Sequence, residues 1–329
     1  MMEGLRASEA LEISYGSPGR IFPLTRTALQ SSSSSFIHLD WLDSYLVRGS
    51  VILTYLQTIL FLADHFVATS VLRQPMVWTL HNIEPHNNRG NWLSRYARIR
   101  FGGSCRWIRV FSEQTVSRAS NHFSIPESRI RVQPEGSFKQ YYRDKCRDNL
   151  TARVADLQDP TYKILFFGRL SPYKGIERLL EALEPIARSK LVHLTIAGQP
   201  VSDNYHRRLA ELCQRRDWCT LEAREIPAEE VCVYFDATDF TCLPFKAVEN
   251  SGSAILAMGF GHPVVAPALG VLPTRLSQQS DLLYAPGELR STLERITSLP
   301  KAELRRIGSL NVKQTEEHDW SNFAAEFLT

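Results

Sequence analysis

Two cationic side chains follow a short apolar run near the middle of the chain. Residues 163–175 read KILFFGRLSPYKG, in which residues 164–167 have the length and composition of a buried parallel strand. Arg169 and Lys174 come after this run, and Gly175 begins a helical pattern. Open α/β sheets hold ligands at the carboxyl ends of their strands, where a helix amino terminus favours an anion. The spacing therefore predicts an anion site at Gly168, Arg169 and Lys174, although an ordinary turn with two solvated cations also explains the motif taken alone.

A second polar loop follows a later strand pattern, in residues 239–267, DFTCLPFKAVENSGSAILAMGFGHPVVAP. Small residues at the start of its apolar helix leave backbone N–H groups approachable, which suits a phosphate or a ribose. A plain N-cap explains Ser251 but not the two small residues after it, so we favour a binding loop. A carboxylate beside such a site would accept hydrogen bonds from sugar hydroxyls. The candidate residues of this loop are Glu249, Asn250, Ser251, Gly252 and Ser253.

Polar side chains also stand at the ends of two strand patterns in the first half. The patterns are FIHLDW (36–41) and MVWTLHN (76–82), and the second is followed by a turn with further polar residues. Neighbouring strands of a parallel sheet present such residues at one edge, where His, Asp and Glu could move protons. Local capping explains some of these residues equally well. The candidates are His38, Asp40, His81, Glu84 and His86.

Residues 89–109, RGNWLSRYARIRFGGSCRWIR, contain six arginines and no acidic residue. Arginine beside aromatic rings is typical of helices that contact anionic membranes. A solvated basic helix is an equally weighted interpretation, and no nucleic-acid-binding motif accompanies the charge. We expect peripheral contact with an anionic membrane surface through Trp92, Arg95, Arg98 and Arg100, and no nucleic-acid partner.

Composition indicates a globular protein with an uneven charge. Its 329 residues suit two domains, and 43% are hydrophobic. Residues 1–150 hold 18 Lys and Arg against 12 Asp and Glu, whereas the remainder holds 20 against 23. The excess of positive charge in the first half suggests an anionic partner there.

Cysteine usage and hydropathy give expectations for the compartment. The six cysteines show no C-x-x-C pair and no zinc spacing, which favours reduced core thiols in the cytoplasm. The first thirty residues lack the apolar region of a signal peptide. Residues 51–63 form the longest apolar stretch, which is too short and too polar to span a bilayer, and a buried helix is expected there.

Strand and helix patterns alternate along the chain, which predicts an α/β fold with doubly wound parallel sheets. A charged stretch at 141–160 separates two halves. We therefore expect one Rossmann-like domain at 1–150 and a second at 151–315. Residues 316–329 are expected to form a closing helix that packs back toward the first domain.

The order of these motifs resembles a known family. GRLSPYKG followed by NSGSAILAMGFGHPVVAP resembles the donor-binding half of glycosyltransferases with the two-Rossmann GT-B architecture. Within that architecture it is similar to the family-four (glycosyltransferase group 1) enzymes, which build polysaccharides and glycolipids. FIHLDW, MVWTLHNIEPHN, VQPEGSF and HDWSNFAAEFL resemble further segments of that family in the same order. The resemblance covers about residues 36–329.

This resemblance implies two Rossmann-like domains facing across a cleft, an acceptor-side domain at 1–150 and a nucleotide-sugar-binding domain at 151–315. It also implies a hexose transfer from a nucleotide diphosphate sugar. The acceptor would be a glycan or a polyprenyl-diphosphate-linked saccharide at the inner face of the membrane. Arg169 and Lys174 would bind the donor diphosphate, Glu249 the donor sugar, and His81 would lie near that sugar. No D-x-D motif occurs, so we expect no metal and no cofactor, with GDP-mannose as the guessed donor. Family resemblance favours retention; inversion would need a base such as Asp40, Glu84 or His86.

Two departures from the family leave alternatives open. The family's second glutamate, which holds the ribose, has no counterpart, because Leu256 and Ala257 stand there. Asn250, Ser251 or Ser253 would then contact the ribose. The opening strand and glycine-rich loop are also missing, so that the start is truncated or YGSPG (15–19) replaces the loop. The alternatives are a non-catalytic sugar-nucleotide-binding or scaffolding subunit, and an epimerase, against which the basic aromatic segment argues.

Overall fold

The computed structural model describes residues 21–32, 35–47, 49–83, 91–146 and 159–316. Contacts divide them into two compact units, unit 1 up to Pro134 and unit 2 from Glu135. The closing helix predicted within 316–329 and the YGSPG segment lie outside the described residues.

Unit 1 is built on a four-stranded sheet in the order β1-β2-β3-β4, and every strand pair is parallel. The strands are β1 (Ile37–Leu39), β2 (Met76–Thr79), β3 (Trp107–Val110) and β4 (Ile130–Val132). All residues of β2 and β3 are buried, as expected for a parallel sheet covered on both faces. The predicted parallel α/β architecture is confirmed for this unit.

The helices of unit 1 are α2 (Pro23–Gln30), α3 (Asp43–Leu46), α4 (Val51–Phe66), α5 (Trp92–Ser104) and α6 (Glu113–Phe123). Local caps start two of them, since Ser50 accepts from the Leu53 N–H (3.3 Å) and Asn91 accepts from the Ser94 N–H (2.8 Å). A one-turn π-helix, η1 (Val67–Val71), continues α4. Trp78 packs edge-on against Phe101 and Phe123 in the core.

Helix α4 differs from the expected buried helix. Val51–Val71 together are long and apolar enough to span a membrane by length and composition, but the same is true of some soluble core helices. The large apolar side chains Ile52, Leu56 and Ile59 are more than half exposed. The expectation of a buried helix is wrong because polar residues, not these apolar ones, face the core.

Unit 2 contains a six-stranded parallel sheet in the order β10-β9-β8-β5-β6-β7. Its strands are β5 (Tyr162–Phe167), β6 (Val192–Ala197), β7 (Cys219–Glu222), β8 (Phe240–Cys242), β9 (Val264–Pro267) and β10 (Leu283–Tyr284). Sequence patterns placed the first five, and only β10 was missed. The order is that of a doubly wound dinucleotide-binding sheet.

Alternate residues of β5 supply the two hydrophobic layers of unit 2. Ile164 and Phe166 face α8 (Ile176–Ala187), α9 (Asp203–Gln214) and α13 (Leu289–Ile296). Leu165 faces α10 (Val231–Asp236), α11 (Gly252–Gly259) and α12 (Leu272–Arg275). The remaining helices of this unit are α7 (Lys139–Cys146) and α14 (Lys301–Glu316).

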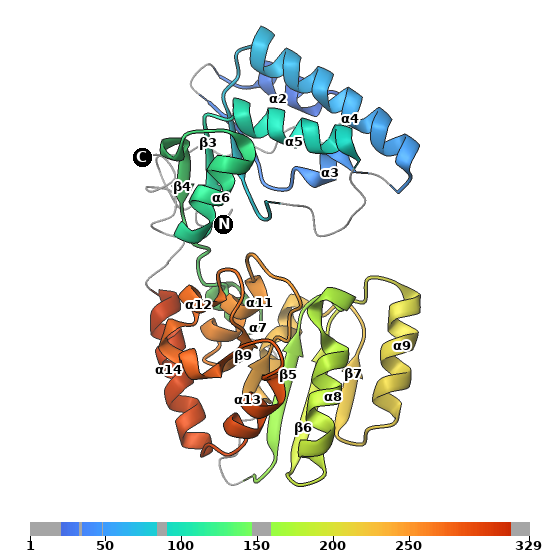
Figure 1. Cartoon of the computed structure of the whole chain (residues 1–329), viewed down its shortest axis with the longest axis vertical. Helices are drawn as coiled ribbons and strands as arrows, with labels where there is room; N and C mark the ends of the chain where they lie inside the picture. Colours follow the sequence, from blue (N-terminus) through green and yellow to red (C-terminus); the bar gives the residue numbers. More distant parts are fainter. Residues whose placement is uncertain (1–20, 33–34, 48, 84–90, 147–158, 317–329) are drawn as a thin grey trace. The chain divides into compact units, whose positions relative to one another are not determined.

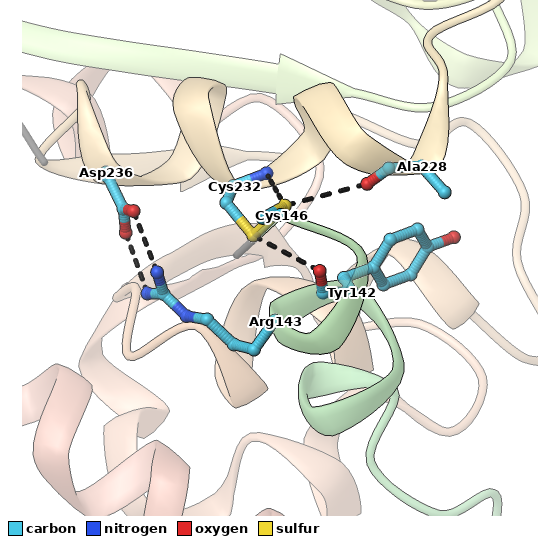
Figure 2. The surroundings of a disulfide bond; sticks show 6 residues. All are labelled: Tyr142, Arg143, Cys146, Ala228, Cys232 and Asp236. Atoms are coloured by element: carbon cyan, nitrogen blue, oxygen red, sulfur yellow. Dashed lines mark hydrogen bonds and ion pairs between the residues drawn. A yellow bond between two sulfur atoms is a disulfide. The ribbon is translucent and has the colours of Figure 1, made fainter. Parts of the chain in front are cut away.

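A disulfide and an ion pair join α7 to α10 (Figure 2). Cys146 is bonded to Cys232, and the Arg143 guanidinium donates to both carboxylate oxygens of Asp236 at 2.7 and 2.8 Å. Two predictions are therefore wrong: residues 141–146 form a helix rather than a linker, and Cys146 and Cys232 are not reduced thiols. The pattern missed the pair because its two cysteines are 86 residues apart and meet only in the fold. The other four cysteines are free thiols.

Candidate functional site

The two predicted loops of unit 2 follow adjacent strands at the point where the strand order reverses. The chain leaves β5 through α8 and continues in β6 on one side, whereas β8 pairs with β5 on the other side. Loops after β5 (168–175) and after β8 (243–251) therefore flank the topological switch point. Ligands of open α/β sheets bind there.

Glycines allow the two loops to touch. Gly168 has φ +134°, and a Cβ built on it would lie 2.7 Å from Ser253 Oγ. Gly175 has φ +74°, and its Cβ would lie 2.0 Å from the carbonyl oxygen of Pro244. The Lys246 N–H donates to the Tyr173 carbonyl at 2.8 Å. The structure thus brings Gly168 and Ser253 together, from two motifs more than 80 residues apart.

Arg169 and Lys174, the cationic residues predicted to bind phosphate, have no anionic partner in the part of unit 2 that the structure describes. Arg169 is exposed, and Lys174 is half-buried with its Nζ 4.1 Å from the Phe245 ring centroid. Burial lowers the pKa of Lys174 from 10.5 to about 8. Neither side chain forms an ion pair with any described carboxylate, so no described residue neutralises their positive charges.

The start of α11 has an N-cap hydrogen bond and also backbone N–H groups without a partner among the described residues. The Ser251 hydroxyl accepts from the Ala254 N–H at 3.2 Å, so this residue is an N-cap. Over the described chain, the N–H groups of Gly252 and Ser253 have no hydrogen-bond partner, as is usual for a first helical turn. A Cβ on Gly252 would meet nothing within 4 Å, so its surroundings are open.

Glu135 is a residue of this loop region that sequence reasoning missed. Its carboxylate accepts from Asn250 Nδ2 at 2.8 Å, and its carbonyl accepts from Arg275 Nη1 at 3.3 Å. Burial lowers the pKa of Arg275, although Glu135 opposes this. Glu135 lies within the VQPEGSF segment, but nothing local in that segment reveals contacts with residues more than a hundred positions away.

The backbone of Glu249 is fixed by Val271, whose N–H donates to its carbonyl at 3.2 Å. At the positions of the missing second glutamate, Leu256 and Ala257 are buried in the core of unit 2. These two side chains pack α11 onto the sheet, so they do not substitute for a ribose-binding carboxylate.

A second cluster lies at the carboxyl ends of β1 and β2 in unit 1. The His81 Nε2 and Asp40 Oδ1 atoms are 2.9 Å apart, and the Trp41 ring stacks on the His81 ring with centroids at 3.9 Å. His38 Nε2 lies 2.8 Å from the Thr79 hydroxyl oxygen. The structure therefore brings together three of the five predicted residues. Glu84 and His86 lie outside the described residues.

The protonation of this cluster follows from its surroundings. Burial is the main cause that lowers the pKa of His38 to about 4, so the ring is neutral near pH 7. Burial acts to raise the pKa of Asp40, but the hydrogen bond and charge of His81, with His38 and Arg109, bring it below its usual value. A carboxylate only accepts, so Nε2 of His81 carries the proton of this hydrogen bond, and Nδ1 is the other nitrogen of the ring.

Arg109, which the sequence placed in a basic surface segment, is buried in β3. Its guanidinium donates to the carbonyls of Gln133 (3.1 Å) and Pro134 (3.2 Å). The charge of this residue acts on His38 and Asp40. Its role within the unit could have been suspected from its place inside the apolar strand WIRV.

The predicted membrane residues separate into two groups. Trp92, Arg95 and Arg100 are exposed. Arg98 is only 5% exposed; it pairs with Asp43 and donates to the carbonyls of Asn82 (2.8 Å) and Ile83 (3.2 Å). The prediction that Arg98 contacts a membrane is wrong, because its guanidinium is bound inside unit 1.

Comparison with known proteins finds a family resemblance in the unit that holds the switch-point loops. Residues 161–301 match the family described as glycosyl transferases group 1. The chain is 24% identical over 255 residues to a GDP-mannose:glycolipid 4-beta-D-mannosyltransferase of Xanthomonas campestris, which covers 75% of this chain and 65% of the relative. It is 28% identical over 219 residues to a D-inositol 3-phosphate glycosyltransferase of Segniliparus rotundus, covering 64% of this chain and 48% of that protein. The chain thus spans under two thirds of the length of either relative.

Solved structures share the two-unit fold. Sucrose-phosphate synthase from Thermosynechococcus elongatus superposes with a TM-score of 0.67 at 19% identity, covering 97% of this chain and 80% of that one. HepE from Anabaena, in complex with UDP and glucose, gives 0.64 at 18% identity, covering 81% and 74%. With the two parallel sheets, these likenesses confirm the predicted two-domain Rossmann-like GT-B fold.

Proposed function

We propose that this chain, whose residues 161–301 match the glycosyl transferases group 1 family, transfers a hexose from a nucleotide diphosphate sugar to a glycan or lipid-linked saccharide. The observation that carries this proposal is the contact between the loops that follow β5 and β8. It places Gly168, the neighbour of Arg169, against Ser253 in the first turn of α11, and Gly175, the neighbour of Lys174, against Pro244.

In the proposed reaction, the bond between the sugar anomeric carbon and the diphosphate oxygen breaks, and its electron pair stays on the diphosphate. Arg169 and Lys174 stabilise that charge by hydrogen bonds of roughly 1.5–3 kcal/mol each. The N–H groups of Gly252 and Ser253 supply further donors. An acceptor hydroxyl oxygen forms the new bond to the anomeric carbon, and its proton passes to the leaving diphosphate in a retaining reaction or to a protein base in an inverting one.

Ser253 is the proposed ribose contact among the three residues considered. The Ser251 hydroxyl accepts from Ala254, and the Asn250 amide donates to Glu135. The Ser253 hydroxyl faces Gly168 at the switch point. Glu249 is proposed to accept hydrogen bonds from the donor sugar.

The proposal is tested by calorimetry with GDP and UDP. Each of the variants Arg169→Ala and Lys174→Ala should weaken the preferred nucleotide roughly 10- to 100-fold. The matched control is Arg188→Ala, because Arg188 follows the opposite end of α8 and is exposed. Unchanged affinity in both site variants would contradict the proposed diphosphate site. Binding without sugar transfer to any membrane-extract acceptor would identify the non-catalytic alternative.

GDP-mannose is the proposed donor. Its support is the mannosyltransferase relative, whose name includes GDP-mannose, whereas HepE was solved with UDP. A panel of GDP- and UDP-sugars, assayed for transfer, decides between them. Transfer is proposed to be independent of metal and of cofactors, so that EDTA should leave the rate unchanged.

The stereochemical course is proposed as retention, on family resemblance. One observation favours inversion instead: the pair of Asp40 and His81 provides the base that inversion requires. The mannosyltransferase relative is also named for a beta-D product. NMR of the product anomer, compared with the anomer of the donor, distinguishes the two courses.

The proposed acceptor is a polyprenyl-diphosphate-linked saccharide at the cytoplasmic, inner face of an anionic membrane. Its support is the glycolipid acceptor in the name of the Xanthomonas relative and the exposed Trp92, Arg95 and Arg100. The cysteines no longer support a cytoplasmic location, because disulfides are rare there. That location therefore follows from the proposed donor and acceptor, and no nucleic-acid partner is proposed.

A further inference from the structure

The distribution of side chains on α4 is the reverse of that on an ordinary surface helix. Its buried residues are Thr54, Thr58, Phe61, Asp64 and His65, four of which are polar. Its large exposed residues are all apolar, and they recur at helical spacing. We call five of them the α4 stripe: Ile52 (74% exposed), Leu56 (55%), Ile59 (54%), Leu60 (41%) and Phe66 (61%).

Hydrogen bonds to the rest of unit 1 fix this orientation. Asp64 accepts from the Leu24 and Thr25 N–H groups, both at 2.8 Å. His65 Nε2 lies 2.7 Å from the Ser104 hydroxyl, and the Thr58 hydroxyl donates to the Leu46 carbonyl at 3.1 Å. Rotating the helix to hide its stripe would break these bonds and leave buried polar groups of unit 1 unpaired, which is costly.

The same bonds argue against a spanning helix. The 21 residues Val51–Val71 could cross a bilayer by length, but a third of their most apolar window is buried in the protein. A spanning orientation would place Asp64 in hydrocarbon without its partners in α2, and Thr58 without its partner in α3. The helix therefore keeps its inner face on unit 1 and offers only its outer face.

Helix α5, which contacts α4, adds interfacial rings and positive charge beside the stripe (Figure 1). Trp92 is 69% exposed, and its ring lies 6.5 Å from that of Tyr55 on α4. Tyr96 of α5 is also exposed, as are Arg95 and Arg100. Asp64 is the one acidic residue within 51–66 and 92–104, and it is buried.

We propose that the outer face of α4 and α5 is a membrane-docking surface that lies in the plane of one anionic leaflet. The α4 stripe enters the acyl boundary, Trp92 and Tyr96 lie at the level of the head groups, and Arg95 and Arg100 contact lipid phosphates. An apolar stripe flanked by cations and free of exposed carboxylates is complementary to such a lipid surface. This inference extends the membrane contact of the proposed function by naming the inserting element, which the sequence had assigned to the core.

Vesicle co-sedimentation tests the surface. The variants are Leu56→Gln with Ile59→Gln in the stripe, Arg95→Glu with Arg100→Glu beside it, and Leu191→Gln as a control, because Leu191 is 60% exposed in unit 2. Phosphatidylcholine vesicles with and without phosphatidylglycerol are the probes. We expect the stripe variant to lose binding at least about tenfold on anionic vesicles. The arginine variant should lose its preference for anionic over neutral vesicles, and the control should bind as the unaltered protein does.

Further measurements separate the possible failures. All variants should keep the melting temperature of the unaltered protein, since the replaced side chains are exposed. Unaltered vesicle binding by the stripe variant would overturn the inference. A second result would also overturn it: the unaltered protein is a dimer that binds no vesicles, and the stripe variant is a monomer. A second copy of the chain, not a membrane, would then cover the stripe. Nucleotide calorimetry is independent of lipid. Vesicle binding without nucleotide binding would therefore contradict the proposed function but not the membrane-docking surface.

Discussion

Replacing Gly175 by alanine should damage both the stability and the nucleotide affinity of unit 2. The new Cβ would lie 2.0 Å from the Pro244 carbonyl oxygen, so the two atoms must separate by roughly 1.4 Å to reach ordinary contact at 3.4 Å. The backbone fixes the position of the Cβ, and the oxygen is itself a backbone atom, so no side-chain rotation can relieve this contact. The loop after β5 must therefore move away from the loop after β8.

The loss of folding free energy in Gly175→Ala has two causes, backbone strain and steric overlap. Substitutions at two other glycines allow them to be measured separately. A positive φ strains alanine by about 1–2 kcal/mol, and overpacking against fixed atoms adds about 1–3 kcal/mol. Gly287 has φ +92° with no atom near its Cβ position, so Gly287→Ala should show the strain alone. Gly103 lies in α5, also in open space, and Gly103→Ala should be neutral or stabilise by about 0.5–1 kcal/mol.

Urea unfolding of the three variants measures these free energies, and calorimetry measures nucleotide binding. We expect Gly175→Ala to lose about 2–5 kcal/mol of stability. Its nucleotide affinity should fall at least about tenfold, since Lys174 moves with the loop. If Gly175→Ala is no more destabilising than Gly287→Ala, the two loops are not packed as described and the argument for a shared site fails.

Three further predictions follow from single contacts. Nucleotide affinity should fall as the pH rises above about 8, the pKa of half-buried Lys174, and Lys174→Arg should remove this dependence. The same lowered pKa makes the contribution of Lys174 to folding stability rise between pH 8 and 10.5, because the unfolded chain then binds more protons. Asp40→Asn should slow transfer roughly 100-fold at unchanged nucleotide affinity if His81 is the base, and an effect on kcat below threefold would argue against that role. Cys146→Ser should reduce the free energy of unfolding by roughly 2–4 kcal/mol, since the bond to Cys232 closes a loop of 86 residues. Dithiothreitol should bring the unaltered protein to the same value, and a smaller loss in either experiment would show that the bond does not form in solution.

Much of the fold could be predicted because its strands are apolar runs flanked by turn residues. Strand β10 was missed because it has only two residues, too few for a pattern. The error on α4 has a different origin. Helical periodicity reveals that one side is apolar and the other polar, but it does not say which side faces the protein. Only the partners of Asp64 and His65, which come from α2 and α5, decide that question.

The candidate site was predictable where one short motif contains the chemistry. Arg169 and Lys174 could be found from a strand followed by a helix, and Ser251 from the start of an apolar helix. Glu135 and Arg109 could not, since their partners become neighbours only when the sheets form. Arg98 shows the same limit: its charge suggested the surface, but Asp43 and two carbonyl groups hold it inside.

Arg98 also connects the outer surface of unit 1 to its interior. It belongs to α5, whose exposed residues include Trp92, Arg95 and Arg100. Its guanidinium donates to the carbonyl of Asn82, the residue immediately after His81. A buried guanidinium cannot give up its acceptors cheaply. Removing this guanidinium would therefore leave the carbonyl groups of Asn82 and Ile83, next to His81 in the chain, without their donor.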